Sequence, residues 1–544
     1  MKSLFLCVLG ISVWFVPVPA ASQQHVPANW IEIKSPHFRV LTDAREKQGR
    51  DLALQFEQMR AVFSQLLCNG KEIQSPPVQI IAMEDQQRLI EYALLMDQDQ
   101  PFAGNVLDSG NLITEADNGF SAGVEPDPAS GLKTIKKYAV KGVYLHNQDV
   151  DYILLNLKLL NRQPTPTQSR IRIGREVVLH EYAHRLLESN FPVLPRWFEE
   201  GFAVYFSTIK IQKDQLVMGV LPQAISSLTP DQFIPVATLF SSAYLAAHSD
   251  HKDSEESAFY AESRRIVDYL LTYHRIDQAQ KYFQLIRRQT PVPEAIKQAF
   301  NMTPEEFDAE IKKLPEGPKM TLSGASPSTA TVFSAPKVDV PITSAPISEL
   351  ALATILADFH LHEPGYHFKA VKEFEAILIK DPLSTGAQRG LGLDSLRHRN
   401  LDAAEAHFRK AIEVDPKNWL SHYYLALVLQ QRADPYKVRE LEQEARLVTE
   451  FNPGFADSFA ILGFALTAQQ KSAEAAAAYE KALRLSPSSE PYSVNLAMIY
   501  MSQEKLDDAK TIFVGLESSR DRKISNLAKT YLQALDVRKK RSSN

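Results

Sequence analysis

Two histidines and a glutamate with the spacing of a metal site lie about a third of the way along the chain. His180, Glu181 and His184 belong to the motif HEYAH, in which the histidines are four residues apart. Residues four apart lie on one face of a helix, so both imidazoles can bind one ion. Catalytic zinc takes three protein ligands and keeps a fourth position for water. Glu181 follows the first histidine directly, which suits a general base that removes a proton from that water.

The alternative to a metal site is a surface helix that happens to carry two hydrogen-bonded histidines. The segment after the motif favours the metal site. Residues 190–195 (NFPVLP) end the first helix, because proline breaks helical hydrogen bonding, and residues 197–205 read WFEEGFAVY. This phrase resembles the W-x-x-E-G-x-A-x-Y element of the gluzincins, metallopeptidases that bind zinc through two histidines and a glutamate. The resemblance implies that Glu200 is the third zinc ligand and gives Glu199 no metal role.

The wider segment is similar to the bacterial peptidase MA-like family, loosely over residues 28–316 and specifically over 175–275. Members of that family are exported and often carry tetratricopeptide repeats (TPRs). The resemblance also implies a tyrosine on a later helix that stabilises the oxyanion, and Tyr260 is the best match. The alternative is that Tyr260 only packs against the helix pair. A metzincin site is excluded, because Leu187 and Asn190 replace the glycine and histidine it requires.

The elements that must position these residues begin upstream. Apolar runs at 37–42, 78–83, 142–145 and 151–157 predict strands, and residues 52–67 repeat their apolar side chains at helical spacing. Residues 99–131 are rich in Asp, Gly, Asn and Pro, which predicts a long surface loop. We therefore expect an α+β zincin-like domain over 28–316, a small mixed sheet with a helical lobe. Strand 151–157 is the candidate to pair with an extended substrate.

Residues 317–346 change in composition and predict a domain boundary. They are dense in Ser, Thr, Pro and Ala and contain few large apolar side chains. Such a segment buries too little surface to offset its ordering entropy. The sequence therefore predicts a flexible linker here.

Beyond the linker, residues 347–544 repeat with a period of about 34 residues. Prolines, alanines and aromatic residues recur on one frame: Pro382, Pro416, Pro453 and Pro487; Ala370, Ala404, Ala475 and Ala509; Phe374, Phe408, Tyr479 and Phe513. Small residues let two helices approach, the aromatic residue fills the gap, and proline ends the second helix. This is the TPR signature. We expect about five repeats, an inter-helix turn lengthened around 432–436, and a capping helix near 524–537.

Composition and the N-terminal residues limit the partners and the cellular location that the sequence allows. The formal net charge of the 544 residues is only −5, which gives no reason to expect a nucleic-acid partner. Lys2, the apolar run 4–16 and the small residues 18–20 predict a signal peptide over 1–20, with a short uncleaved anchor as the alternative. After cleavage only Cys68 remains, and no further segment is apolar enough to span a membrane. The mature chain is expected in a bacterial periplasm or outside the cell.

Together these features predict an exported zinc peptidase, in the first instance an endopeptidase. The concave surface of the repeats is expected to bind the protein substrate or a partner protein and to raise its local concentration. Two alternatives stay open. One is a non-catalytic scaffold with a relic or structural zinc site, and the other is hydrolysis of a non-peptide amide.

Overall fold

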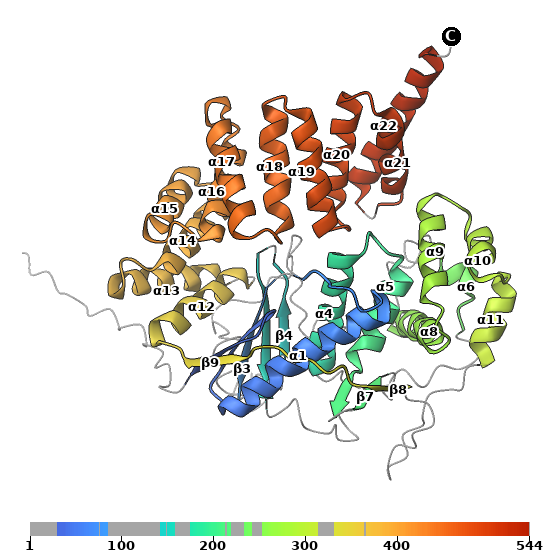
Figure 1. The fold of residues 1–544 in the computed structure, drawn as a ribbon, viewed down its shortest axis with the longest axis horizontal. Coiled ribbons are helices and arrows are strands. Elements are labelled where there is room, and N and C mark those ends of the chain that lie inside the picture. The colour runs from blue at the N-terminus through green and yellow to red at the C-terminus, as the bar shows by residue number, and fades with distance from the viewer. Residues whose placement is uncertain are drawn as a thin grey trace, which may run out of the picture.

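The computed structural model describes residues 30–75, 77–84, 142–147, 149–157, 174–212, 215–218, 233–241, 253–313, 331–363, 366–519 and 521–542. The expected signal peptide (1–20) and surface loop (99–131) lie outside these residues. A sheet with helices packed on it and a helical lobe beside it lie along one side of an arc of paired helices (Figure 1). None of the helices in the described ranges is long and apolar enough to cross a membrane.

Six strands of the described ranges form a mixed sheet, which is the first layer. Its strands are β1 (Ile31–Lys34), β2 (Phe38–Thr42), β3 (Val78–Met83), β4 (Gly142–Leu145), β5 (Asp151–Asn156) and β9 (Thr343–Pro346), in the order β4-β5-β3-β2-β1-β9. β2, β3 and β5 are parallel, and β4, β1 and β9 pair antiparallel with their neighbours. The four strands predicted from apolar runs are confirmed. β1 and β9 were not predicted.

The position of β5 corrects one expectation. Strand 151–157 was the candidate to pair with a substrate, but β5 is interior and pairs with β3 on one side and β4 on the other. Its backbone hydrogen-bonding groups are therefore already used. Within the described ranges, β4 is the strand at this edge of the sheet.

Helices cover both faces of the sheet, which explains why its central strands contain consecutive apolar residues, Ile80–Met83 in β3 and Tyr152–Leu155 in β5. On one face, Ile80 and Ala82 of β3 pack with α1 (Glu46–Leu67) and α4 (Gly174–Asn190). On the other face, Ile81 and Met83 pack against α12 (Glu349–His362). The helix that begins the repeat region is therefore part of the core of the sheet.

A helical lobe with a small second sheet follows α4. Its helices are α5 (Arg196–Ser207), α6 (Val236–Leu239), α8 (Asp253–Thr272), α9 (Ile276–Arg287), α10 (Val292–Phe300) and α11 (Pro304–Lys313). The second sheet has the order β6-β7-β8, with β6 (Lys210–Gln212), β7 (Gln215–Met218) and β8 (Thr331–Ser334). The predicted helical pattern of this region is confirmed for the described residues.

The prediction of a flexible linker over 317–346 is wrong for residues 331–346. β8 pairs antiparallel with β7, and β9 pairs antiparallel with β1 near the start of the described chain. Arg50 of α1 also donates to the carbonyl oxygen of Ile342 at 2.6 Å. Backbone pairing, which needs no large side chain, supplies the order that the composition did not predict. Residues 314–330 lie outside the described part of the chain.

In the repeat region, the described residues form a solenoid of five helix pairs and a final helix. The pairs are α12 with α13 (His367–Lys380), α14 (Thr385–Arg397) with α15 (Leu401–Val414), α16 (Trp419–Arg432) with α17 (Val438–Phe451), α18 (Ala456–Ala468) with α19 (Ser472–Leu485), and α20 (Glu490–Ser502) with α21 (Leu506–Leu516), followed by α22 (Arg522–Ser542). The 3-10 turn η3 (Pro435–Lys437) accommodates the three extra residues of the third repeat. These features agree with the predicted repeat pattern.

Close contacts between the paired helices explain the repeating residue types. A Cβ atom on Gly392 would lie 2.6 Å from the Phe408 ring, and one on Gly463 would lie 2.8 Å from the Tyr479 ring. The repeating alanines and aromatic side chains are buried. Helix α17 differs, because Leu441 occupies the alanine position of its repeat. The helices are thus held by complementary small and large side chains.

Candidate metal centre

Two consecutive helices carry the candidate metal ligands. α4 presents His180 and His184 one turn apart, while Tyr182 and Leu186 of the same helix are buried in the core. The chain leaves α4 through a short turn and enters α5 directly after Pro195, whose carbonyl oxygen accepts from the amide of Phe198 at 2.9 Å. Proline suits this position because its missing N–H is not needed at a helix start. The tight turn brings the first turn of α5 beside the two histidines.

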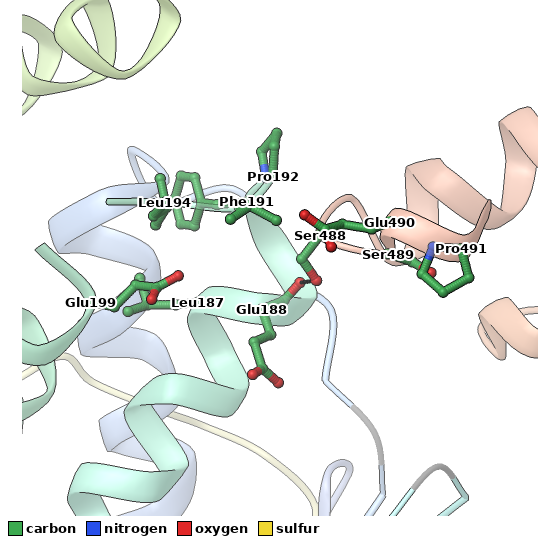
Figure 2. Close-up of a pocket in the computed structure, with 11 residues that line it drawn as sticks. Leu187, Glu188, Phe191, Pro192, Leu194, Glu199, Ser488, Ser489, Glu490 and Pro491 are labelled. Carbon is green, nitrogen blue, oxygen red and sulfur yellow. Dashed lines mark hydrogen bonds between the residues drawn. The ribbon is translucent and has the colours of Figure 1, made fainter. Parts of the chain in front are cut away.

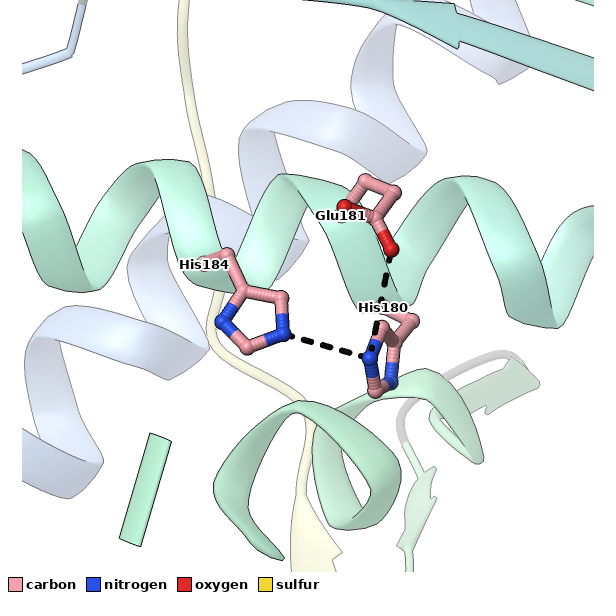
Figure 3. Close-up of side chains that lie close together, drawn as sticks. All are labelled: His180, Glu181 and His184. Carbon is pink, nitrogen blue, oxygen red and sulfur yellow. Dashed lines mark hydrogen bonds and ion pairs between the residues drawn. The ribbon is translucent and has the colours of Figure 1, made fainter. Parts of the chain in front are cut away.

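The side chains of His180, His184 and Glu200 converge. The Nε2 atoms of the two histidines are 3.2 Å apart, and the Oε2 atom of Glu200 lies 3.4 Å from each of them. Figure 3 shows that both imidazole rings project from the same side of α4. The structure therefore brings together the three residues that the sequence proposed as ligands.

These distances fit a zinc ion. Ligands about 2.0–2.1 Å from a tetrahedral ion are about 3.3 Å from one another. The triangle of two imidazole nitrogens and one carboxylate oxygen has sides of 3.2, 3.4 and 3.4 Å. An ion on its axis would lie about 2.0 Å from all three atoms and would retain a fourth position. The two-nitrogen, one-oxygen donor set also matches the chemistry that zinc accepts in catalytic sites.

The electrostatics favour an ionised Glu200 carboxylate. Burial by itself would raise the pKa of Glu200, but hydrogen bonds with His180 and His184 outweigh it and hold the pKa well below its usual range. Arg196, one turn earlier on α5, has its Nε atom 3.7 Å from the other carboxylate oxygen. The side chain of Glu200 keeps 14% of its surface exposed and that of His184 keeps 22%. Glu200 and His184 therefore border solvent, whereas His180 is buried beside them, with 9% of its side chain exposed.

Glu181 lies beside this triangle, and one of its carboxylate oxygens is within 4.8 Å of ligand atoms of both His180 and His184. Its Oε1 atom is 3.9 Å from Nε2 of His180, and its side chain is 16% exposed. Figure 3 shows its carboxylate directed towards His180. This arrangement suits a base that acts on a water held by a metal at the adjacent position.

Tyr260 lies on α8, the helix that packs on α5. Its side chain is half-buried and its ring is 5.8 Å from that of Phe259. Three residues further along α8, the Ser263 backbone meets α5 at Gly201, the residue after Glu200. The structure thus places Tyr260 on a helix that packs against α5, which carries the third candidate ligand. An oxyanion role for its hydroxyl stays a prediction.

A charged pair next to the candidate ligands was not predicted from the sequence. Arg185 follows His184 on α4, and its Nε atom lies 3.1 Å from Oδ2 of Asp151, which is fully buried at the start of β5. Tyr144 of β4 donates to the same oxygen at 2.8 Å. The sequence did contain one sign of this pair, an aspartate at the start of a predicted apolar strand, because a buried carboxylate requires a partner. Its partner lies 34 residues away and only the fold identifies it.

Comparison with known proteins identifies the repeats. A family model for the tetratricopeptide repeat matches residues 389–434 and 445–513, so the C-terminal region consists of TPRs. None of the curated proteins matches the chain.

Three solved structures illustrate the likeness. MamA from Desulfovibrio magneticus RS-1 is 16% identical and covers 35% of this chain and 96% of its own, with a TM-score of 0.27. YrrB, described as a TPR protein with an unusual peptide-binding site, is 18% identical over 33% of this chain and 90% of its own, with a TM-score of 0.29. PilF from Pseudomonas aeruginosa is 16% identical over 36% of this chain and 93% of its own, with a TM-score of 0.30.

Proposed function

We propose that the chain is an exported, zinc-dependent peptidase of the gluzincin type whose TPR region binds a protein. The observation that carries the proposal is the convergence of Glu200 on both histidines of the motif. These groups come from two helices and are arranged at the separations that a tetrahedral ion requires. The mixed sheet followed by a helical lobe agrees with a zincin-like domain.

Each residue of the site has a distinct proposed role. His180, His184 and Glu200 would hold zinc, which when bound acidifies a water molecule and polarises a substrate carbonyl. Glu181 takes the proton of the attacking water and passes it to the leaving amine, so the carboxylate is regenerated in each cycle. Tyr260 is proposed to donate a hydrogen bond to the tetrahedral oxyanion.

An extended substrate is proposed to pair with β4 instead of the interior strand β5. β4 is antiparallel to β5 and packs against α4, the helix of the two histidines. In strand addition, backbone hydrogen bonds supply the affinity for an extended peptide, and pockets for alternate side chains supply the specificity. A substrate added here would run beside the candidate ligands.

The experiment that tests the proposal compares the wild-type chain with Glu181→Gln and Glu188→Gln. Glu188 is the matched control, because it lies on the same helix with a side chain that is 53% exposed. We expect one zinc per chain in all three proteins by metal analysis. In a peptide-library digestion, Glu181→Gln should lose activity by about 10²–10⁴-fold, the usual contribution of a general base. Equal cleavage by all three proteins, or no zinc in the wild type, would overturn the proposal.

The second candidate function is a non-catalytic TPR scaffold with a structural or relic zinc site. The TPR match favours it, because such repeats form extended surfaces for proteins or peptides. The same experiment separates the two candidates, since zinc without cleavage supports the scaffold. Under both candidate functions, Glu181→Gln should still capture the partner protein from a bacterial envelope extract.

A further inference from the structure

The turn between β4 and β5 lies between the repeats and α4, the helix that carries His180 and His184 and is called the zinc helix below. This turn spans residues 146–150, of which Gln148 is outside the described residues, and we call it the β4–β5 turn. Asp149 and Val150 within it are buried, as is Asp151 directly after it. Buried carboxylates in a turn are costly unless other groups neutralise or hydrogen-bond them. Their partners therefore show what the turn does in the fold.

On one side the partners come from α4. Arg185, the residue after His184, pairs with Asp151 and also donates from Nη2 to the carbonyl oxygen of Asn147 at 3.3 Å. His146 places Nδ1 3.0 Å from the other Asp151 oxygen. One guanidinium group therefore fixes both the turn and the strand that follows it to the helix of the two histidines.

On the other side the partners come from the repeats. The hydroxyl of Tyr424, on α16, donates to Oδ2 of Asp149 at 2.7 Å, and both side chains are buried. The hydroxyl of Tyr152 donates to Asp358 of α12. Arg389 of α14 approaches the second oxygen of Asp358 at 3.8 Å. The first helices of three successive repeats, α12, α14 and α16, thus take part in one network of hydrogen bonds and charges.

A second contact joins the repeats to the far end of α4. The hydroxyl of Ser488, in the turn between α19 and α20, donates to the carbonyl oxygen of Glu188 at 2.8 Å. Figure 2 shows Ser488 meeting the last turns of α4, beside a recess of about 290 Å³ bordered by Phe191 and Pro491. The last carbonyl groups of a helix have no partner within the helix. The repeats supply one here.

We propose that the repeats hold the zinc helix in position, with Tyr424 and Asp149 as positioning residues that act through the β4–β5 turn and Arg185. The repeats are then a structural part of the metal site in addition to being a protein-binding surface. The inference goes beyond the proposed function, because it holds whether or not the site hydrolyses anything. The competing view is that the repeats only rest on the lobe, and that α4 keeps its order without them.

The test uses the full chain without metal. Tyr424→Phe removes one hydroxyl and leaves the buried Asp149 carboxylate without that donor. We expect amide hydrogen exchange over 142–157 and 174–190 to become about tenfold faster, the effect of losing one buried hydrogen bond. The matched control is Tyr500→Phe, because the Tyr500 hydroxyl donates to Glu480 at 2.9 Å within the repeats. Unchanged exchange over 174–190 in Tyr424→Phe would overturn the proposal.

Two further measurements make the result specific. Asp149→Asn keeps an acceptor for Tyr424 and should exchange within about threefold of the wild type, whereas Asp149→Ala should behave like Tyr424→Phe. Zinc affinity, from competition with a chelator, should fall in Tyr424→Phe and Asp149→Ala, by less than the about 10–100-fold lost when a direct hydrogen-bond partner of a metal ligand is removed, because both residues act through the turn and Arg185. If no protein binds zinc but exchange changes as stated, the proposed function fails and this inference stands. If Asp149→Ala exchanges like the wild type, the inference fails.

Discussion

A Cβ atom on Gly201 would lie 2.4 Å from the carbonyl oxygen of Ser263. α5 and α8 therefore touch backbone to backbone at the residue that follows Glu200. The obstacle is backbone on both helices, so no side chain can rotate away to relieve it. The distance between the two helices, and with it the position of the Glu200 carboxylate, depends on glycine at this place.

Gly201→Ala is expected to destabilise the protein. Alanine normally gains about 1 kcal/mol over glycine inside a helix. Overpacking costs about 1–3 kcal/mol, and it exceeds that gain where the neighbour is backbone. The variant should unfold at lower denaturant concentration and bind zinc more weakly, as read from circular dichroism and chelator competition. Gly515→Ala is the control, because a Cβ there meets nothing within 4 Å, and it should raise stability by about 0.5–1 kcal/mol. Stabilisation by both substitutions would contradict the packing argument.

Adjacent glutamates provide a second test of the site. Glu200→Gln replaces the carboxylate that lies 3.4 Å from both imidazoles. Zinc affinity should fall by more than about 100-fold, because losing a ligand exceeds the effect of losing an outer partner. Glu199→Gln, which changes the same functional group one residue earlier, should bind zinc within about threefold of the wild type. Affinities measured by competition with a chelator decide the matter, and equal losses in the two variants would remove Glu200 from the ligand set.

The features predicted from the sequence were those that local spacing determines. A four-residue spacing places His180 and His184 on one face of a helix whatever the remaining fold is. The runs that became β3 and β5 contain four consecutive apolar residues each, 80–83 and 152–155, because both faces of the sheet are covered. An alanine and an aromatic residue, such as Ala404 and Phe408, likewise recur at equivalent positions of neighbouring repeats, because these side chains form the contacts between adjacent helices.

The features that escaped prediction depend on contacts between distant parts of the chain. β9 (TSAP) has no strand-like composition, and it becomes a strand because β1, about 300 residues earlier, offers a free edge. The pairing of Tyr424 with Asp149 joins residues 275 positions apart. No periodicity records such a pair, since each residue alone resembles any polar group of a loop or helix. In the described part of the predicted linker, residues 331–346, pairing with β7 and β1 therefore gives an order that the composition did not predict.

The aromatic residues of the repeats allow a direct test of the packing. Phe408 is fully buried against Gly392, so Phe408→Ala leaves a cavity in the solenoid. The expected loss of unfolding free energy is about 3–5 kcal/mol. Phe368→Ala is the matched control, because that side chain is 71% exposed, and its effect should stay within about 0.5 kcal/mol. Denaturant unfolding followed by circular dichroism measures both, and similar losses would mean that the burial is misassigned.

Asp457 makes the stability of the repeats depend on pH. Burial raises the pKa of Asp457 to about 6 from an ordinary value of 3.8, although a hydrogen bond from Tyr423 at 3.0 Å opposes the rise. Between these two pH values the folded state binds more protons than the unfolded state, so the free energy of unfolding falls as pH rises. The fall amounts to at most about 3 kcal/mol and is complete above about pH 6.

Asp457→Asn should remove this dependence, because an amide has no proton to release yet still accepts the bond from Tyr423. The measured quantity is the difference in unfolding free energy between variant and wild type at several pH values, in which the contributions of all other groups cancel. This difference should grow in favour of the variant from about pH 4 to about pH 6 and then stay constant. Asp402→Asn is the control, since the Asp402 side chain is 90% exposed. A difference for Asp457→Asn that does not change with pH would show that this carboxyl keeps an ordinary pKa, and hence that water reaches it in the folded repeats.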